Sequence, residues 1–214
     1  MHIAEGFLPV AHAAAWTAIS TPFAVQGFRR TTEVLRSDPE RRLMLAASGA
    51  FLFALTAVKL PSVGGSSSHP TGVALAALGF GPSVTVALAL IVLLFQAILL
   101  AHGGITTLGA NLFSLGVAGP CSFWLVHRLL RRWCSTSVAV FAATLVASLA
   151  TYSITSLQLS LAFPDPHAGI FASFLRFGAI FALTQGTVAL AEAAFTVFTL
   201  RALSLLAPEV YASR

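Results

Sequence analysis

Apolar runs decide the fold of this chain, and the clearest is PSVTVALALIVLLFQAILLA at residues 82–101. This run has twenty residues and no charged side chain, and about 20 apolar residues are what a helix needs to cross the hydrocarbon core of a bilayer. Of the 214 residues in the chain, 57% are hydrophobic and 9% are charged, against about 25% charged in ordinary soluble domains. So few polar groups cannot cover the surface of a water-soluble protein, and we expect an integral membrane protein.

The remaining apolar stretches predict an all-α polytopic fold with seven transmembrane helices. The complete set is 7–28, 43–60, a short third segment at 70–80, 82–101, 105–126, 136–158 and 171–200. We expect one membrane domain that covers residues 1–214, with an extracellular N-terminus at 1–6 and a functional loop at 61–70.

Arginines set the predicted orientation. Ten of the twelve basic residues lie in or beside the linkers 29–42 and 127–135 and the tail 201–214. Basic loops are retained on the cytoplasmic side, and seven crossings place all three stretches there, with the N-terminus outside and the C-terminus inside. The +5 charge is therefore typical of a multi-pass protein of the inner (plasma) membrane, in contact with the lipid bilayer and without a nucleic-acid partner.

The third segment is too short to cross a membrane as a straight helix. Residues 70–80 rise only about 15 Å at 1.5 Å per residue, so the loop 61–70 is expected to dip toward the membrane midplane. Irregular backbone at that depth has to be buried in protein or line a cavity, whereas an ordinary extracellular loop is the alternative. Pro70 suits the first position of a helix, which places His69 at or next to the N-cap.

The first residues, MHIAEG at 1–6, predict a metal site. No signal-peptide pattern precedes Gly6, so we expect Met1 to carry a free amine. This amine, the amide nitrogen of His2 and the His2 imidazole can close two fused, nearly planar chelate rings around one ion, and His69 is the best fourth ligand. Square-planar nitrogen ligation suits Ni(II) or Cu(II) and is accessible to low-spin Co(II). The alternative for His2 is an ordinary solvated terminus.

Three motifs occur in this order along the chain: MHIAEGFLP at 1–9, GSSSHPTG at 65–72 and HGGITTLGAN at 102–111. They resemble the CbiM/NikM family, the substrate-capture components of cobalt and nickel energy-coupling-factor transporters. The resemblance covers most of the chain and implies a seven-helix fold. It also implies a metal held by the Met1 amine, the amide and imidazole nitrogens of His2, and the His69 imidazole. The start is more similar to the cobalt branch, so Co(II) for cobalamin synthesis is the expected substrate and Ni(II) the alternative.

The same resemblance implies partners: a membrane coupling protein, cytoplasmic ATPase subunits and a small auxiliary membrane subunit. The chain itself is not expected to be an enzyme, because its Gly-rich stretches lack the Lys-Ser/Thr of a phosphate-binding loop. The cytoplasmic linkers are the natural surfaces for coupling, which makes these residues candidates: Arg29, Arg30, Arg128 and Arg131.

Other polar residues are candidates for supporting roles near the outer face. The three serines before His69, which are Ser66, Ser67 and Ser68, can fix its tautomer by hydrogen bonding or cap the next helix. His102 is expected to orient its loop or to lie on the entry path, and Asn111 matches a motif position near the site. Glu192 is the one acid deep in an apolar segment, which makes it a candidate functional residue. Arg176 is about 24 Å away along the same helix, which is too far for an ion pair with Glu192.

Two rival functions use the same residues. An intramembrane hydrolase would combine the serines at 66–68 with His69, but the sequence places no carboxylate beside that loop and contains no His-Glu-x-x-His motif. A proton-driven secondary carrier would use Glu192 and a histidine, and inverted repeats, which are typical of many such carriers, are not found in the sequence.

Overall fold

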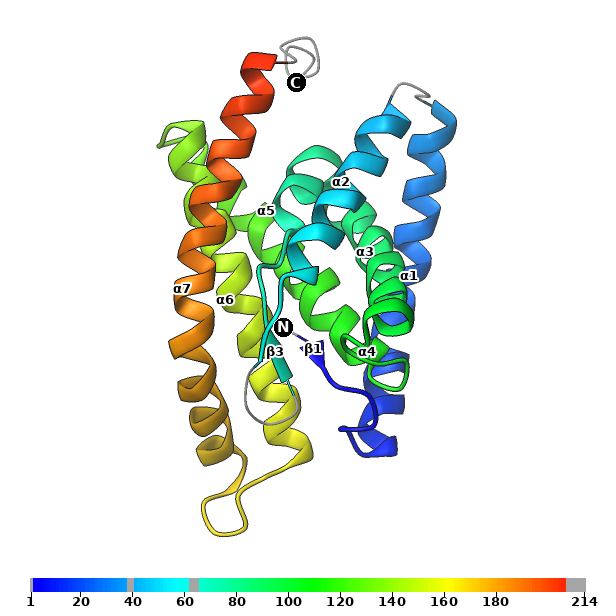
Figure 1. Ribbon diagram of the computed structural model, residues 1–214, viewed down its shortest axis with the longest axis vertical. Helices are drawn as coiled ribbons and strands as arrows, with labels where there is room; N and C mark the ends of the chain where they lie inside the picture. The colour runs from blue at the N-terminus through cyan, green and yellow to red at the C-terminus, as the bar shows by residue number, and fades with distance from the viewer. Residues whose placement is uncertain (1, 38–40, 62–65, 207–214) are drawn as a thin grey trace.

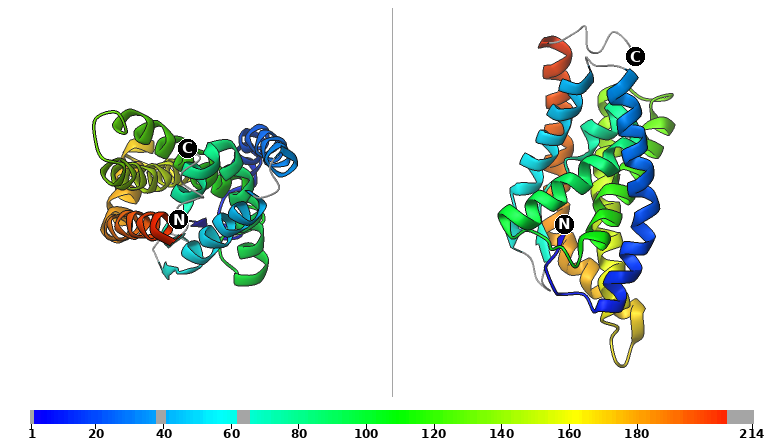
Figure 2. Two further views of the ribbon diagram at one scale, coloured as in Figure 1. Left: turned by 90° about the horizontal axis from the view of Figure 1, so that it is seen from above. Right: turned by 90° about the vertical axis from the view of Figure 1, so that its right-hand side faces the viewer.

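A computed structural model describes residues 2–37, 41–61 and 66–206 as a bundle of helices with a short sheet among them (Figure 1). Seen along and across the bundle, α1 lies on the opposite side from α6 and α7 (Figure 2). The helices are α1 (Val10–Ser37), α2 (Arg41–Ala57), α3 (Val73–Leu100), α4 (Leu108–Asn111), the π-helical η1 (Leu112–Ala118), α5 (Gly119–Leu130), α6 (Thr136–Ala162) and α7 (Gly169–Leu206). The strands are β1 (His2–Ile3), β2 (Leu60–Pro61) and β3 (Ser66–Ser68).

Four helical stretches in the described part of the chain are long and apolar enough to cross a membrane. They are Val73–Leu100, Leu108–Leu130, Thr136–Ala162 and Thr184–Leu205. Large apolar side chains such as Ile98, Leu99 and Phe198 are exposed on the outside of the bundle, where lipid rather than water would cover them. The protein is therefore a mostly helical, multi-pass membrane protein, as the composition predicts.

Helix α3 consists of two helices that meet at Gly81. Gly81 has φ 80° and ψ 170°, a conformation that glycine adopts without strain, and Pro82 opens the second half. The two halves pack together, because Ala74 of the first and Leu93 of the second belong to one buried cluster. A separate short third helix is thus present, at 73–80.

The predicted start of that short helix was wrong. The helix begins at Val73, with Gly72 as its N-cap, and not at Pro70. His69 consequently lies in non-helical chain, three residues before the cap. A contact from another helix is the physical reason, since the carboxylate of Glu192 in α7 binds the main-chain N–H groups of Thr71 and Gly72.

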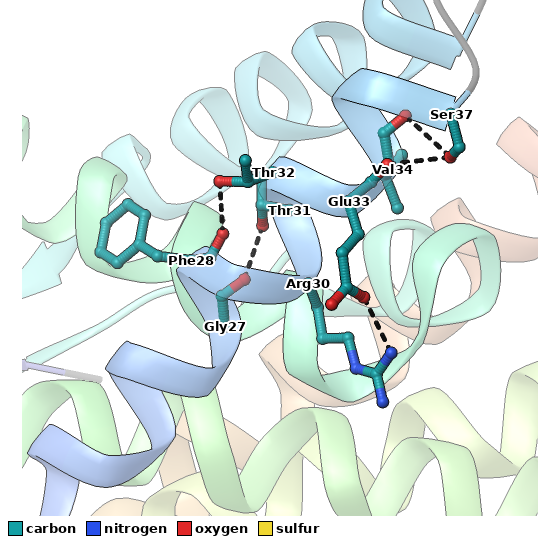
Figure 3. Close-up of polar contacts among 8 residues, drawn as sticks. All are labelled: Gly27, Phe28, Arg30, Thr31, Thr32, Glu33, Val34 and Ser37. Carbon is teal, nitrogen blue, oxygen red and sulfur yellow. Dashed lines mark hydrogen bonds and ion pairs between the residues drawn. The ribbon is translucent and has the colours of Figure 1, made fainter.

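Both predicted cytoplasmic linkers are partly helical. Helix α1 continues through Arg29 to Ser37, and α5 continues to Leu130. In the last turns of α1, Thr31 donates to the Gly27 carbonyl and Arg30 forms an ion pair with Glu33 at 2.8 Å (Figure 3). Hydropathy detects only the part of a helix that lipid surrounds. The polar turns that follow remain helical, because water and i,i+3 or i,i+4 partners satisfy their polar groups.

A three-stranded antiparallel sheet makes the all-α expectation incomplete. The strand order is β1-β3-β2, with His2 opposite Ser67, Ile3 opposite Ser66 and Leu60 opposite Ser68. The sheet joins the N-terminal segment to the loop that leads to His69. Strands of two or three residues carry too little periodicity to be read from sequence.

Replacing Gly109 by alanine is expected to destabilise the bundle. A Cβ atom at this position would lie 2.6 Å from the main-chain nitrogen of Thr17 in α1, and overpacking of this kind typically costs about 1–3 kcal/mol. Thermal unfolding in detergent measures the effect. Gly178→Ala in α7 is the matched control, because no atom lies within 4 Å of its added methyl group. Equal unfolding temperatures for both variants would contradict the close approach of α4 and α1.

Candidate metal centre

Three histidines from separate parts of the chain meet in one buried cluster. His2 comes from β1, His69 follows β3 and His102 follows α3. The ring centroids are 4.3 Å apart for His2 and His69, 4.4 Å for His2 and His102, and 4.9 Å for His69 and His102. One nitrogen from each ring lies within 4.8 Å of the others. This spacing allows three imidazoles to converge on a single ion.

Hydrogen bonds determine which nitrogen of His69 is free to bind. Its Nδ1 lies 2.7 Å from the main-chain oxygen of Pro70, and a carbonyl oxygen only accepts, so Nδ1 carries the proton and Nε2 carries the lone pair. Nε2 of His69 is buried without a partner among the described residues, as are Nε2 of His2 and Nδ1 of His102. Buried polar atoms normally have hydrogen-bond partners. Three such nitrogens without one in a single cluster are what a bound metal ion would satisfy.

Burial keeps these imidazoles in the uncharged form that ligates metals. It lowers the pKa of His102 to about 3 and is the largest cause that holds the pKa values of His2 and His69 well below their ordinary range. A charged imidazole would lose its hydration here without gaining a counter-ion. The cluster is therefore ready to bind a cation at neutral pH without first releasing protons from the rings.

Asn111 holds β1 in place by imitating a neighbouring strand. Its Oδ1 accepts from the Ile3 amide at 2.7 Å, and its Nδ2 donates to the Ile3 carbonyl at 3.0 Å. The Thr107 hydroxyl donates to the same carbonyl at 2.8 Å. Three residues after Ile3, the Gly6 amide donates to the Thr106 hydroxyl at 3.0 Å. These contacts fix the residue next to His2, and the supporting role of Asn111 in metal binding stays a prediction.

The serines beside His69 have other partners than expected. The Ser67 hydroxyl lies 2.7 Å from Nε2 of His102, and the Ser68 hydroxyl lies 2.9 Å from the hydroxyl of Thr184 in α7. The Pro70 carbonyl, and not a serine, fixes the His69 tautomer. Neither of these serines caps α3, whose N-cap is Gly72; the side chain of Ser66 lies outside the described part. Strand pairing directs these side chains away from the helix start.

His102 lies in the cluster with His2 and His69, and its predicted role in orienting the loop or on the entry path stays a prediction. Its Nε2 lies 3.2 Å from Nδ1 of His2, and it is buried, with 2% of its surface exposed. Gly103, with φ 78°, turns the chain here, and a Cβ atom at this glycine would lie 3.2 Å from Nδ2 of Asn111. The HGG pattern at 102–104 signalled a tight turn but not the direction of the imidazole.

The other predicted residues lie elsewhere. Met1 is outside the described residues, so the ligand role of its amine stays a prediction. Arg30 and Arg131 each line a cavity that includes Gly81, far along the chain from the histidines. Glu192 does not pair with Arg176, which binds Asp165 at 3.1 Å. The candidates for partner coupling lie in the two arginine-rich linkers and are Arg29, Arg30, Arg128 and Arg131.

Two residues near the site were missed by the sequence analysis. Gln185 of α7 donates to the His69 carbonyl at 3.0 Å, and Thr184 contacts Ser68. A buried glutamine within an apolar helix is a signal that was available, because a polar side chain there needs a partner. The identity of that partner depends on the packing of α7 against the loop.

These features define a class: a multi-pass helical membrane protein with a buried cluster of three imidazoles. The chain belongs to the CbiM family, because the family's sequence model, described as "Cobalt uptake substrate-specific transmembrane region", matches residues 2–210. It is therefore a transport component of a cobalt uptake system in the plasma membrane, with Co(II) as the transported substrate.

Similar proteins cover nearly the whole chain. The cobalt transport protein CbiM of Streptomyces coelicolor is 55% identical over 204 residues, which are 95% of this chain and 88% of that protein. The cobalt transport protein CbiM of Desulforamulus reducens is 51% identical over 211 residues, 99% of this chain and 84% of that one. A crystal structure of a transition metal transporter superposes with a TM-score of 0.76 at 25% identity and covers 96% of this chain and 93% of its own.

Acidification is expected to destabilise the metal-free protein. Below about pH 6.5 the histidines of the unfolded chain take up protons, whereas the lowered pKa values keep the folded cluster neutral. The unfolded state then binds more protons, and stability falls by about 1.4 kcal/mol per pH unit for each such histidine. Thermal unfolding in detergent between about pH 5 and pH 7 measures this slope.

His102→Gln should reduce that slope by the share of one histidine. His167→Gln, which changes an exposed imidazole outside the cluster, is the control and should keep the wild-type profile. A stability that does not change over this pH range would show that the three rings are not held neutral by the fold.

Proposed function

We propose that this chain captures Co(II) on the outer side of the membrane, as the substrate-specific subunit of an energy-coupling-factor transporter that supplies cobalamin synthesis. The observation that carries the proposal is the buried cluster of His2, His69 and His102, in which one ring nitrogen of each lies within 4.8 Å of the others and Nε2 of His69 has no partner among the described residues. The chelate with the Met1 amine uses Nδ1 of His2, which lies 3.2 Å from Nε2 of His102 and exchanges that contact for the metal. Family membership supports cobalt as the cargo.

The ligands in this proposal are the Met1 amine, the amide and imidazole nitrogens of His2, and Nε2 of His69. Strand pairing supports it, because β1 brings His2 beside the loop that carries His69, with ring centroids 4.3 Å apart. Nitrogen-rich ligation favours a late first-row transition ion over Mg²⁺ or Ca²⁺, which prefer oxygen. Ni(II) is the alternative cargo, since the same donors suit it.

Seven crossings, with the N-terminus outside and the C-terminus inside, complete the proposed topology. Arg30 and Arg131 line two separate cavities that Gly81 also lines, which supports one arginine-rich cytoplasmic end. We propose that the linkers 29–42 and 127–135 are where Arg29, Arg30, Arg128 and Arg131 meet the membrane coupling protein. Cytoplasmic ATPase subunits supply the energy, and a small auxiliary membrane subunit completes the complex.

The two rival functions have less support. Ser67 lies beside His102, as a hydrolase serine would lie beside its base, but Nδ1 of His102 has no partner among the described residues, so no carboxylate orients this histidine as in a Ser-His-Asp triad. Ser68 is paired with Thr184. Glu192 accepts three hydrogen bonds from Thr71 and Gly72. A carboxylate engaged in this way is poorly placed to relay protons for a secondary carrier.

His69→Ala is expected to abolish cobalt capture without unfolding the bundle. The change removes one proposed ligand from a loop and leaves the helices intact, so at least about 100-fold weaker Co(II) binding should follow. Equilibrium dialysis of purified protein with Co(II), and separately with Ni(II), measures binding and ranks the two ions. His167→Ala should bind as wild type does, and unchanged affinity in His69→Ala would refute the site.

One residue added before Met1 should be as damaging as His2→Ala. The extension converts the terminal amine into a peptide nitrogen and moves the new amine out of the chelate ring. Cobalt occupancy, measured by metal analysis after gel filtration, tests the amine as a ligand. An extension at the C-terminus is the matched control. Full occupancy in the N-terminally extended protein would remove the amine from the ligand set and leave the imidazoles to be tested separately.

A further inference from the structure

Helix α7 follows the metal-site loop through a series of side-chain contacts. Thr184 pairs with the Ser68 hydroxyl, and Gln185 donates to the His69 carbonyl at 3.0 Å. About two turns later, Glu192 reaches Thr71 and Gly72. The polar face of one helix thus contacts nearly every residue from 68 to 72.

Glu192 makes the strongest of these contacts. One carboxylate oxygen accepts from the Thr71 amide at 2.8 Å, and the other accepts from the Thr71 hydroxyl at 2.6 Å and the Gly72 amide at 2.8 Å. The side chain is buried, with 2% of its surface exposed. A negative charge at the N-terminus of the 73–80 helix satisfies N–H groups that the helix itself leaves free. Removing it would leave several buried donors unpaired.

The position of Thr71 determines where His69 lies. Only Pro70 separates the two residues, and the ring of proline fixes its φ angle. The Pro70 carbonyl also holds Nδ1 of His69, so a shift of Thr71 turns the imidazole. The contact between α7 and Thr71 therefore reaches the ring nitrogen through a short and stiff piece of chain.

We propose that Glu192 of α7 is a positioning residue that holds the His69 loop in the histidine cluster and thereby sets how long cobalt is retained. The inference rests on the proposed function, because it takes His69 as a ligand. It assigns a task to a buried acid that the metal site does not contact. It also identifies α7 as the helix that has to separate from residues 71–72 before His69 can leave the site.

A release experiment tests the proposal in purified full-length protein. Wild type, Glu192→Gln and Thr71→Val are loaded with Co(II), and its loss to excess chelator is followed by the visible absorption of the bound ion. The valine is isosteric and removes only the hydroxyl that Glu192 accepts. We expect release to be about tenfold faster in either variant, since hydrogen bonds to charged groups are broken. The absorption band, which reports ligand geometry, should shift.

Two controls separate positioning from general stability. Thr71→Ser keeps the hydroxyl and should restore slow release. Thr196→Val changes a buried threonine about one turn further along α7, whose hydroxyl has no protein partner among the described residues, and it should release cobalt at the wild-type rate. In the double variant Glu192→Gln/Thr71→Val, release should be no faster than in Glu192→Gln alone, because both changes break the same contact.

The outcomes distinguish this inference from the proposed function. Wild-type release rates and spectra in Thr71→Val and Glu192→Gln, with cobalt fully bound, would overturn the positioning role and leave the metal site standing. Equal acceleration in Thr196→Val would also overturn it, because the effect would then be general loosening of α7. Failure of the wild type to retain cobalt would refute the proposed site itself. If Glu192→Gln does not fold, Thr71→Val with Thr71→Ser decides the matter alone.

Discussion

The site depends on a single constraint: the main chain of the N-terminal strand is buried among helices and needs hydrogen-bond partners there. Unsatisfied N–H and C=O groups are costly away from water. β3 satisfies one edge of β1, and Asn111 satisfies Ile3 from the other side. Because pairing sets the register, His2 stands opposite Ser67 and beside His69. The rings of His2 and His69 are thus aligned by backbone pairing rather than by ring packing.

Burial then decides the chemistry of the cluster. Three imidazoles lie together, and residues 2–37, 41–61 and 66–206 contribute no acid to their cluster, so desolvation and mutual repulsion keep them uncharged. Each ring presents a nitrogen that has no partner in the part of the chain that the structure describes. Such a pocket is poorly satisfied when empty, and it favours a cation that prefers nitrogen.

Local sequence patterns singled out His2 and His69, which the structure brings together, and most helices, because each signal is contained in a few adjacent residues. The MHIAEG start, the SSSHPTG loop and the apolar runs belong to this kind. The start of the short third helix was misplaced, since Glu192 binds Thr71 and Gly72 across 120 residues or more of chain. The arginine-rich linkers were predicted as loops but continue as helix, because hydropathy reports lipid contact and not hydrogen bonding.

The sequence by itself determined the membrane class, the family and the pair of histidines, because composition and short motifs carry that information. Only the tertiary structure decided that His102 joins His2 and His69, with its Nε2 3.2 Å from Nδ1 of His2. It also decided that Gln185 and Glu192 of α7 contact the His69 loop. These contacts join residues about 100 positions apart or more. No local pattern encodes them, since they arise from the packing of helices and from the need of buried polar groups for partners.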